Sequence, residues 1–130
     1  MSSRYLATVA AITSLLFGGV GLVLPEAFGR ASGIEFDATA TALVRLACAS
    51  YVGFAVLAWL ARDLTDPMAW RAVAGANAVS WAVSAVVIAL ALVSGLGTAV
   101  SWALVAMQVG FGVVWSVAYI QARPAVPPAA

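Results

Sequence analysis

The fold is decided by residues 72–122, which read AVAGANAVSWAVSAVVIALALVSGLGTAVSWALVAMQVGFGVVWSVAYIQA. These 51 consecutive residues contain no charged side chain. A helix rises about 1.5 Å per residue and the hydrocarbon core of a bilayer is about 30 Å thick, so about 20 apolar residues cross it once. The stretch is therefore long enough for two crossings. Ser94-Gly95-Leu96-Gly97-Thr98 divides it, which is typical of a turn between two helices.

The rest of the chain contains two more long stretches without charge. Residues 5–25 and 46–61 are also uncharged. Because backbone groups in lipid must be satisfied within the segment, these stretches predict helices, and the alternation expected of transmembrane strands is absent from the sequence. We therefore predict four membrane spans, near residues 5–24, 40–61, 71–93 and 99–121. The first is expected to end at Pro25, because proline cannot continue the hydrogen bonds of an α-helix, and a loop is expected between it and the second span.

The expected fold class is all-α: a polytopic membrane protein with four transmembrane helices in an up-down bundle. We expect one domain over residues 1–123 and a disordered tail rich in proline and alanine over 124–130. A signal peptide is the alternative for the first span. Its uncharged run of about 20 residues is, however, longer than the 7–15 apolar residues of a typical signal peptide, which favours a span that is retained.

The composition supports a membrane protein and excludes several other classes. Of the 130 residues, 65% are hydrophobic and 8% are charged, whereas an average soluble domain has roughly 45–50% apolar and about 25% charged residues. All six basic residues are arginine, five acids nearly balance them, and there is no histidine. This excludes a soluble globular enzyme, a disordered chain, a nucleic-acid binder and histidine-ligated metal or haem. A single cysteine, Cys48, also excludes an internal disulfide or a C-x-x-C redox pair.

The placement of the arginines predicts the orientation. With four spans, the N-terminus, the loop between the second and third spans and the C-terminus share one side of the membrane. Four arginines belong to that side: Arg4, Arg62, Arg71 and Arg123. The other side holds only Arg30 and Arg45. By the positive-inside rule, both termini are expected in the cytoplasm.

Two groups of residues within the predicted spans can meet. Asn77, Ser80 and Ser84 share one face of the third span with Trp81, and Gln108 and Tyr51, on the fourth and second spans, lie near the depth of Ser84. Uncompensated amides and hydroxyls are costly in hydrocarbon, so we expect these side chains to face the interior of the bundle. They either form interhelical hydrogen bonds, each worth about 0.6 kcal/mol, or line a small chamber for a lipid, quinone or other apolar ligand. The candidate chamber residues are Asn77, Ser80, Ser84, Gln108, Tyr51 and Trp81, with Phe111 and Trp115 as further aromatic walls.

Arg45 is the charge that lies deepest in a predicted span. It follows Asp37 by eight residues, about 12 Å along a helix. A charge at that depth needs a route to water or a partner. We expect Arg45 to pair with Asp37 or Glu35. The alternative is an anion or polar-headgroup site at the outer mouth of the bundle, formed by the same three residues, because the planar guanidinium suits a carboxylate or a phosphate.

The segment Leu24–Asp63 carries a recognisable set of features: Leu24-Pro25-Glu26-Ala27-Phe28-Gly29, Gly33, Asp37, Arg45, and Gly53 within a Tyr-Val-Gly-Phe run. With them, about a third of the chain resembles a class of small bacterial four-helix integral membrane proteins of unknown function. Such proteins often have a glycine two or three positions after the arginine, where this chain has Ala47 and Cys48. The resemblance implies the four-span architecture and a bacterial source, and it implies no activity.

These observations favour a protein that is not an enzyme. No nucleophile–base pair, glycine-rich phosphate loop or metal-ligand cluster is present in the sequence, and no cofactor is expected. We expect a multi-pass protein of the bacterial cytoplasmic membrane that is a structural or interaction protein, or that binds a small apolar ligand or lipid. The alternative is an oligomeric small-solute transporter or channel. Small multidrug transporters use a carboxylate within the membrane, however, and every acid here lies in a loop.

Overall fold

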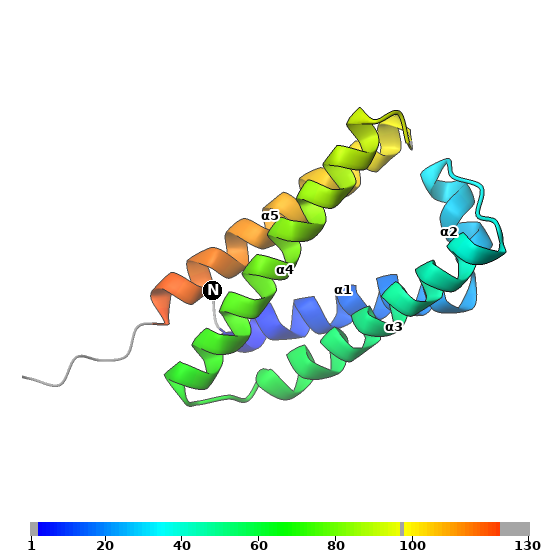
Figure 1. Ribbon diagram of the computed structural model, residues 1–130. Helices are drawn as coiled ribbons and strands as arrows, with labels where there is room; N and C mark the ends of the chain where they lie inside the picture. Colours follow the sequence, from blue (N-terminus) through cyan, green and yellow to red (C-terminus); the bar gives the residue numbers. More distant parts are fainter. Residues whose placement is uncertain (1–2, 97, 123–130) are drawn as a thin grey trace, which may run out of the picture.

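The computed structural model describes residues 3–96 and 98–122, in which five helices are joined by short loops. Its helices are α1 (Ser3–Val23), α2 (Pro25–Ser32), α3 (Ala38–Ala61), α4 (Pro67–Val93) and α5 (Ala99–Gln121), drawn in Figure 1. Four of them, all except α2, are long and apolar enough to cross a membrane. The all-α fold with four spans is therefore confirmed, and each predicted end lies within four residues of the helix end. The tail predicted at 124–130 lies outside the described residues.

Short polar residues fix where three of the long helices begin. The Asp37 carboxylate accepts a hydrogen bond from the Ala40 backbone N–H at 2.7 Å and caps α3. Asp66 accepts from the Met68 N–H at 2.9 Å and caps α4, where Pro67 occupies the first helical turn. Thr98 and Ser101 form a reciprocal capping box at the start of α5. Each cap satisfies backbone donors that have no partner within the helix.

Helix α2 lies in a segment that we expected to be a loop. Pro25, which we expected to end the first helix, instead begins a new one after a break at Leu24. Proline suits the first helical turn because the N–H that it lacks would have no partner there. At the other end, Gly33 adopts a left-handed φ of 71°, and the N–H groups of Gly33 and Ile34 donate to Arg30 and Gly29, at 3.1 Å and 2.9 Å. This pair of bonds is a Schellman motif, which explains why α2 ends at Ser32.

The four long helices form two hairpins that diverge. Helix α1 packs along α3, and α4 packs along α5, while contacts between the two pairs are few. Figure 1 shows the hairpins meeting at one end and separating toward α2. We call the end that contains Trp70 and Trp115 the closed end, and the end formed by α2 and the turn after α4 the open end.

The buried core lies at the closed end. Small residues of α1, among them Ala7 and Ala10, pack against Ala58 of α3 in the same cluster as Trp70 and Trp115. The two tryptophan rings lie 5.7 Å apart, and Trp115 is completely buried. Small side chains let helix backbones approach closely, which is how helices associate within lipid. The core therefore packs the hairpins together at the closed end, and space remains between them at the open end.

Candidate functional site

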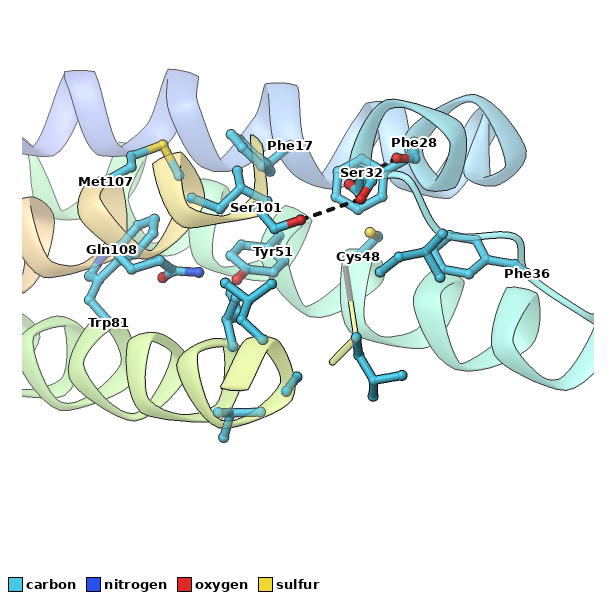
Figure 2. Close-up of a pocket in the computed structure, with 17 residues that line it drawn as sticks. Phe17, Phe28, Ser32, Phe36, Cys48, Tyr51, Trp81, Ser101, Met107 and Gln108 are labelled. Atoms are coloured by element: carbon cyan, nitrogen blue, oxygen red, sulfur yellow. Dashed lines mark hydrogen bonds between the residues drawn. The ribbon is translucent and has the colours of Figure 1, made fainter. Parts of the chain in front are cut away.

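The space between the hairpins at the open end is a pocket of about 310 Å³, shown in Figure 2. All five helices contribute to it, because α2 and the loop that follows cover the region where the hairpins diverge. Its volume is at the lower end of the roughly 300–1,000 Å³ that is usual for small-molecule sites. The residues that line it include Phe17, Phe28, Ser32, Phe36, Cys48, Tyr51, Trp81, Ile88, Leu92, Ser101, Leu104, Met107 and Gln108.

The walls of the pocket are apolar and partly aromatic. Helix α4 presents Trp81, Ile88 and Leu92, which are spaced so that they share one face of the helix. Helix α5, which forms a hairpin with α4, contributes Leu104 and Met107. No charged residue lines the pocket in the part of the chain that is described. The walls therefore suit an apolar molecule.

An aromatic pair separates the pocket from the closed end. The rings of Trp81 and Phe111 are stacked, with their centroids 4.8 Å apart and their planes at 19°. Trp81 is buried, and it belongs both to the pocket wall and to the core cluster. We call this pair the floor of the pocket. Trp81 therefore lies where the pocket meets the buried core.

Gln108 lines this pocket and also has one buried polar atom without a partner. Only 4% of its surface is exposed, and its Oε1 is buried without a hydrogen-bond partner in the structure. In Figure 2 its amide extends from α5 toward Tyr51 and the middle of the pocket. Buried polar groups almost always have a partner, so an exception is informative. The other buried atom without a partner among the described residues is Nε1 of Trp115, which lies in the closed-end core.

The two hairpins are also linked at the open end, through hydrogen bonds to one carbonyl group. The Ser32 backbone oxygen at the end of α2 accepts from Ser101 Oγ at 3.3 Å and from Thr98 Oγ1 at 3.4 Å. Thr98 also packs so closely on Gly33 that a Cβ there would overlap its methyl group. We call this contact the latch. It ties α2 to the start of α5 across the top of the pocket.

Three of the six predicted chamber residues are brought together. Gln108, Tyr51 and Trp81 line the pocket, on α5, α3 and α4. Asn77 is buried lower on α4 and donates from Nδ2 to the Val73 carbonyl of its own helix at 2.9 Å. Ser80 and Ser84 are partly buried on α4 and do not line this pocket.

The two further predicted aromatic walls lie below the pocket. Phe111 supports the floor from α5, and Trp115 belongs to the closed-end core.

At the predicted charge site at the outer mouth, the described residues form no ion pair. Arg45 is exposed on α3, and among the described residues no ion pair joins it to Asp37 or Glu35. The Asp37 carboxylate is instead directed at the backbone of α3, which it caps. The expected ion pair is therefore not present in this structure.

The ion pairs that the structure does contain lie at the other end of the hairpins. Asp63 is 3.5 Å from Arg4 and 3.1 Å from Arg62.

Several pocket residues were not found from the sequence. Phe28, Ser32 and Phe36 belong to α2 and the loop after it, where no helix was predicted, so their position above the pocket was not foreseeable. Phe17 and Met107 are apolar residues within spans, and their composition does not distinguish the pocket side from the lipid side. Ser101 carried a usable signal, because its spacing from Thr98 is that of a capping box.

The comparisons with known proteins add no relative. No protein-family model, no curated protein and no solved structure matches the chain. The structure itself shows four long apolar helices, as expected of a multi-pass integral membrane protein. Among the described residues, no group of three or more histidine, cysteine, aspartate or glutamate side chains is placed to hold a metal ion.

Proposed function

We propose that this protein is a non-enzymatic integral membrane protein that binds one lipid or lipid-like apolar molecule between its two hairpins. The observation that carries the proposal is the apolar pocket at the open end, which is walled by all five helices and bounded on one side by Trp81, the ring that stacks on Phe111. A space of this kind within hydrocarbon is filled by an apolar molecule at little cost. Helix α2 and the latch give it a cover, which distinguishes it from an ordinary groove on the lipid-facing surface.

The proposal includes a location and an orientation. We place the protein in the cytoplasmic membrane of a bacterium, with both termini in the cytoplasm, because Arg4, Arg62 and Arg71 lie at the closed end. Aromatic rings support this assignment: the Arg71 guanidinium lies over the Tyr119 ring at 4.5 Å and that of Arg62 over the Trp59 ring at 3.6 Å. Tyrosine and tryptophan rings are enriched in the headgroup layer, where they can also contact an arginine. The pocket then lies in the half of the membrane away from the cytoplasm.

The experiment that tests the proposal fills the pocket. Leu104 lines it from α5 and is partly buried, so Leu104→Trp places a large side chain in the space. Ala106 is two positions further, exposed, and outside the pocket, which makes Ala106→Trp a matched control. Lipids that co-purify with each variant in mild detergent are extracted and quantified per protein by mass spectrometry. We expect one component, present at about one molecule per chain in the wild type and in Ala106→Trp, to be lost from Leu104→Trp.

The same experiment has a clear contrary result. If Leu104→Trp retains its helical content and co-purifies with the same molecules in the same amounts as the wild type, the pocket does not bind a ligand. The helical content is measured by circular dichroism. A second substitution, Ile88→Trp, repeats the test from α4 in case the first variant does not fold.

A further inference from the structure

We infer that the molecule bound in the pocket is a quinone with an apolar tail, and that one carbonyl oxygen of the quinone accepts hydrogen bonds from the amide nitrogen of Gln108 and from the Tyr51 hydroxyl. The inference rests on the proposed function, which it deepens by naming the chemical class of the ligand. Three observations carry it: which polar groups face the pocket, which of them have no partner, and how deep in the membrane they lie.

The side chain of Gln108 turns its amide nitrogen, Nε2, toward the pocket. The residue is only 4% exposed, and the protein encloses its Oε1 completely. Figure 2 shows the nitrogen end of the amide directed at Tyr51 and the middle of the pocket. Among the described residues, Nε2 has no hydrogen-bond partner. An amide N–H can only donate, so the group that it lacks is an acceptor.

The other polar side chains of the lining differ in whether they are already paired. The Ser32 hydroxyl donates to the Phe28 carbonyl at 3.1 Å, and the Ser101 hydroxyl donates to the Ser32 carbonyl at 3.3 Å. A hydroxyl has one proton, so these two serines have none left for a ligand. The Tyr51 hydroxyl has no partner among the described residues. Gln108 on α5 and Tyr51 on α3 are therefore free donors on opposite hairpins.

The depth of Gln108 limits which acceptors can reach it. Gln108 follows Thr98, the cap of α5, by ten residues, which is about 15 Å along the helix. That distance is about half the hydrocarbon thickness, so the amide lies near the middle of the membrane. The ester carbonyls of a phospholipid stay near the interface with its headgroup. A carboxylate would be an uncompensated charge, because no charged side chain lines the pocket among the described residues. The acceptor is therefore neutral and belongs to a molecule without a charged headgroup.

A quinone meets these conditions. Its carbonyl oxygens are acceptors, each can accept two hydrogen bonds, and the oxidised ring has no donor that would itself need a partner. Its flat ring suits a space whose walls include the rings of Phe17, Tyr51 and Trp81. The part of the pocket lined by Phe28 and Ile34, toward the open end, is apolar and takes the tail.

The test compares ligands that differ in the acceptor. Purified wild-type protein in lipid nanodiscs is incubated with a tritiated decyl benzoquinone, which is displaced by the unlabelled quinone, by decylbenzene and by methyl laurate. Concentrations are expressed as mole fractions in the bilayer, so that differences in partitioning cancel. We expect the quinone to displace the label at about tenfold lower concentration than decylbenzene, since two net hydrogen bonds contribute about threefold each. Methyl laurate, a neutral ester without a ring, should be weaker than the quinone.

Two variants locate the effect at the two donors. Gln108→Leu keeps a side chain of similar size and Tyr51→Phe removes only the hydroxyl, and in each we expect the tenfold preference to fall to about threefold because one hydrogen bond remains. The matched controls are Gln121→Leu, at an exposed position of α5, and Tyr119→Phe, whose hydroxyl accepts from Arg71 outside the pocket. Both controls should keep the preference of the wild type. Circular dichroism shows that all four variants are helical.

The inference and the proposed function fail in different ways. Equal displacement by the quinone and by decylbenzene in the wild type overturns the inference, and so does a preference that is unchanged in Gln108→Leu or in Tyr51→Phe. Displacement by methyl laurate at the same concentration as the quinone assigns the carbonyl to an ester and overturns the quinone. If the labelled quinone does not bind, the inference also fails, and the pocket itself is then judged by the lipids lost from Leu104→Trp. If that variant loses nothing, the proposed function fails with it.

Discussion

Two neighbouring glycines in α1 show how one residue position can determine the packing of two helices. At Gly18 an added Cβ would lie 2.8 Å from the Cys48 backbone oxygen and 3.0 Å from Cβ of Tyr51, both on α3. At Gly19 an added Cβ would meet nothing within 4 Å. The absence of a side chain is therefore required at Gly18, where α1 and α3 approach closely, and is not required at Gly19.

Alanine substitutions at these two positions should have opposite effects on stability. In Gly18→Ala the two helices must move apart, and overpacking of this kind costs about 1–3 kcal/mol. In Gly19→Ala the loss of backbone freedom in the unfolded chain stabilises the helix by up to about 1 kcal/mol. Thermal unfolding in detergent, followed by circular dichroism, measures both. Equal melting temperatures for the two variants would show that α1 and α3 do not pack as closely as described.

At the scale of the helices, hydropathy was sufficient to predict the long spans and insufficient for α2. The four long helices follow from charge-free runs of the length that a bilayer demands. The signals of α2 were present in Pro25, in Glu26 at its first turn and in Gly33 after its end. These signals did not lead to a predicted helix, because the proline was interpreted as the end of the first helix. Proline is equally suited to the first turn of a new one.

The candidate site was predicted mainly from the depth of its residues in the membrane, and depth alone does not define a site. Gln108 and Tyr51 were grouped because they lie at similar depth, and both line the pocket. Asn77 was grouped by sharing a helix face with Trp81, but its amide bonds to its own helix, a choice that depends on the side-chain rotamer. The pocket exists because the hairpins diverge, and the angle between them depends on long-range packing that periodicity does not encode.

The latch between α2 and α5 is expected to govern the mobility of α2. Ser101→Ala removes one of the two hydroxyls that donate to the Ser32 carbonyl, and a hydrogen bond of this kind contributes about 0.5–1.5 kcal/mol. We therefore expect faster hydrogen–deuterium exchange of the backbone amides in residues 25–36, measured by mass spectrometry. Ser116→Ala is the control, because its hydroxyl bonds within α5 to the Gly112 carbonyl at 2.8 Å. Unchanged exchange in Ser101→Ala would mean that the latch does not hold α2.

At the scale of the whole molecule, the two ends of the protein differ both in shape and in charge. The closed end carries the core and, on residues at helix ends, Arg4, Arg62 and Arg71, while the open end carries α2 and the pocket. An acidic loop follows α2, with Glu35 and Asp37. If the closed end faces the cytoplasm, a ligand enters the pocket from the other leaflet or from the space beyond it. The orientation of the protein therefore decides which leaflet supplies the ligand.

The orientation is tested by cysteine labelling of the full chain in intact bacterial cells. In a Cys48→Ser background, Glu35→Cys places a thiol in the loop after α2 and Thr65→Cys places one in the loop between α3 and α4, both at exposed positions. A maleimide that does not cross membranes should label Glu35→Cys directly and Thr65→Cys only after the cells are permeabilised, because the arginines at the closed end favour the cytoplasm. The reverse pattern would put the pocket in the cytoplasmic leaflet. Equal labelling of both in intact cells would indicate molecules inserted in both directions, and would favour the antiparallel assembly of a small transporter over a ligand-binding protein with one orientation.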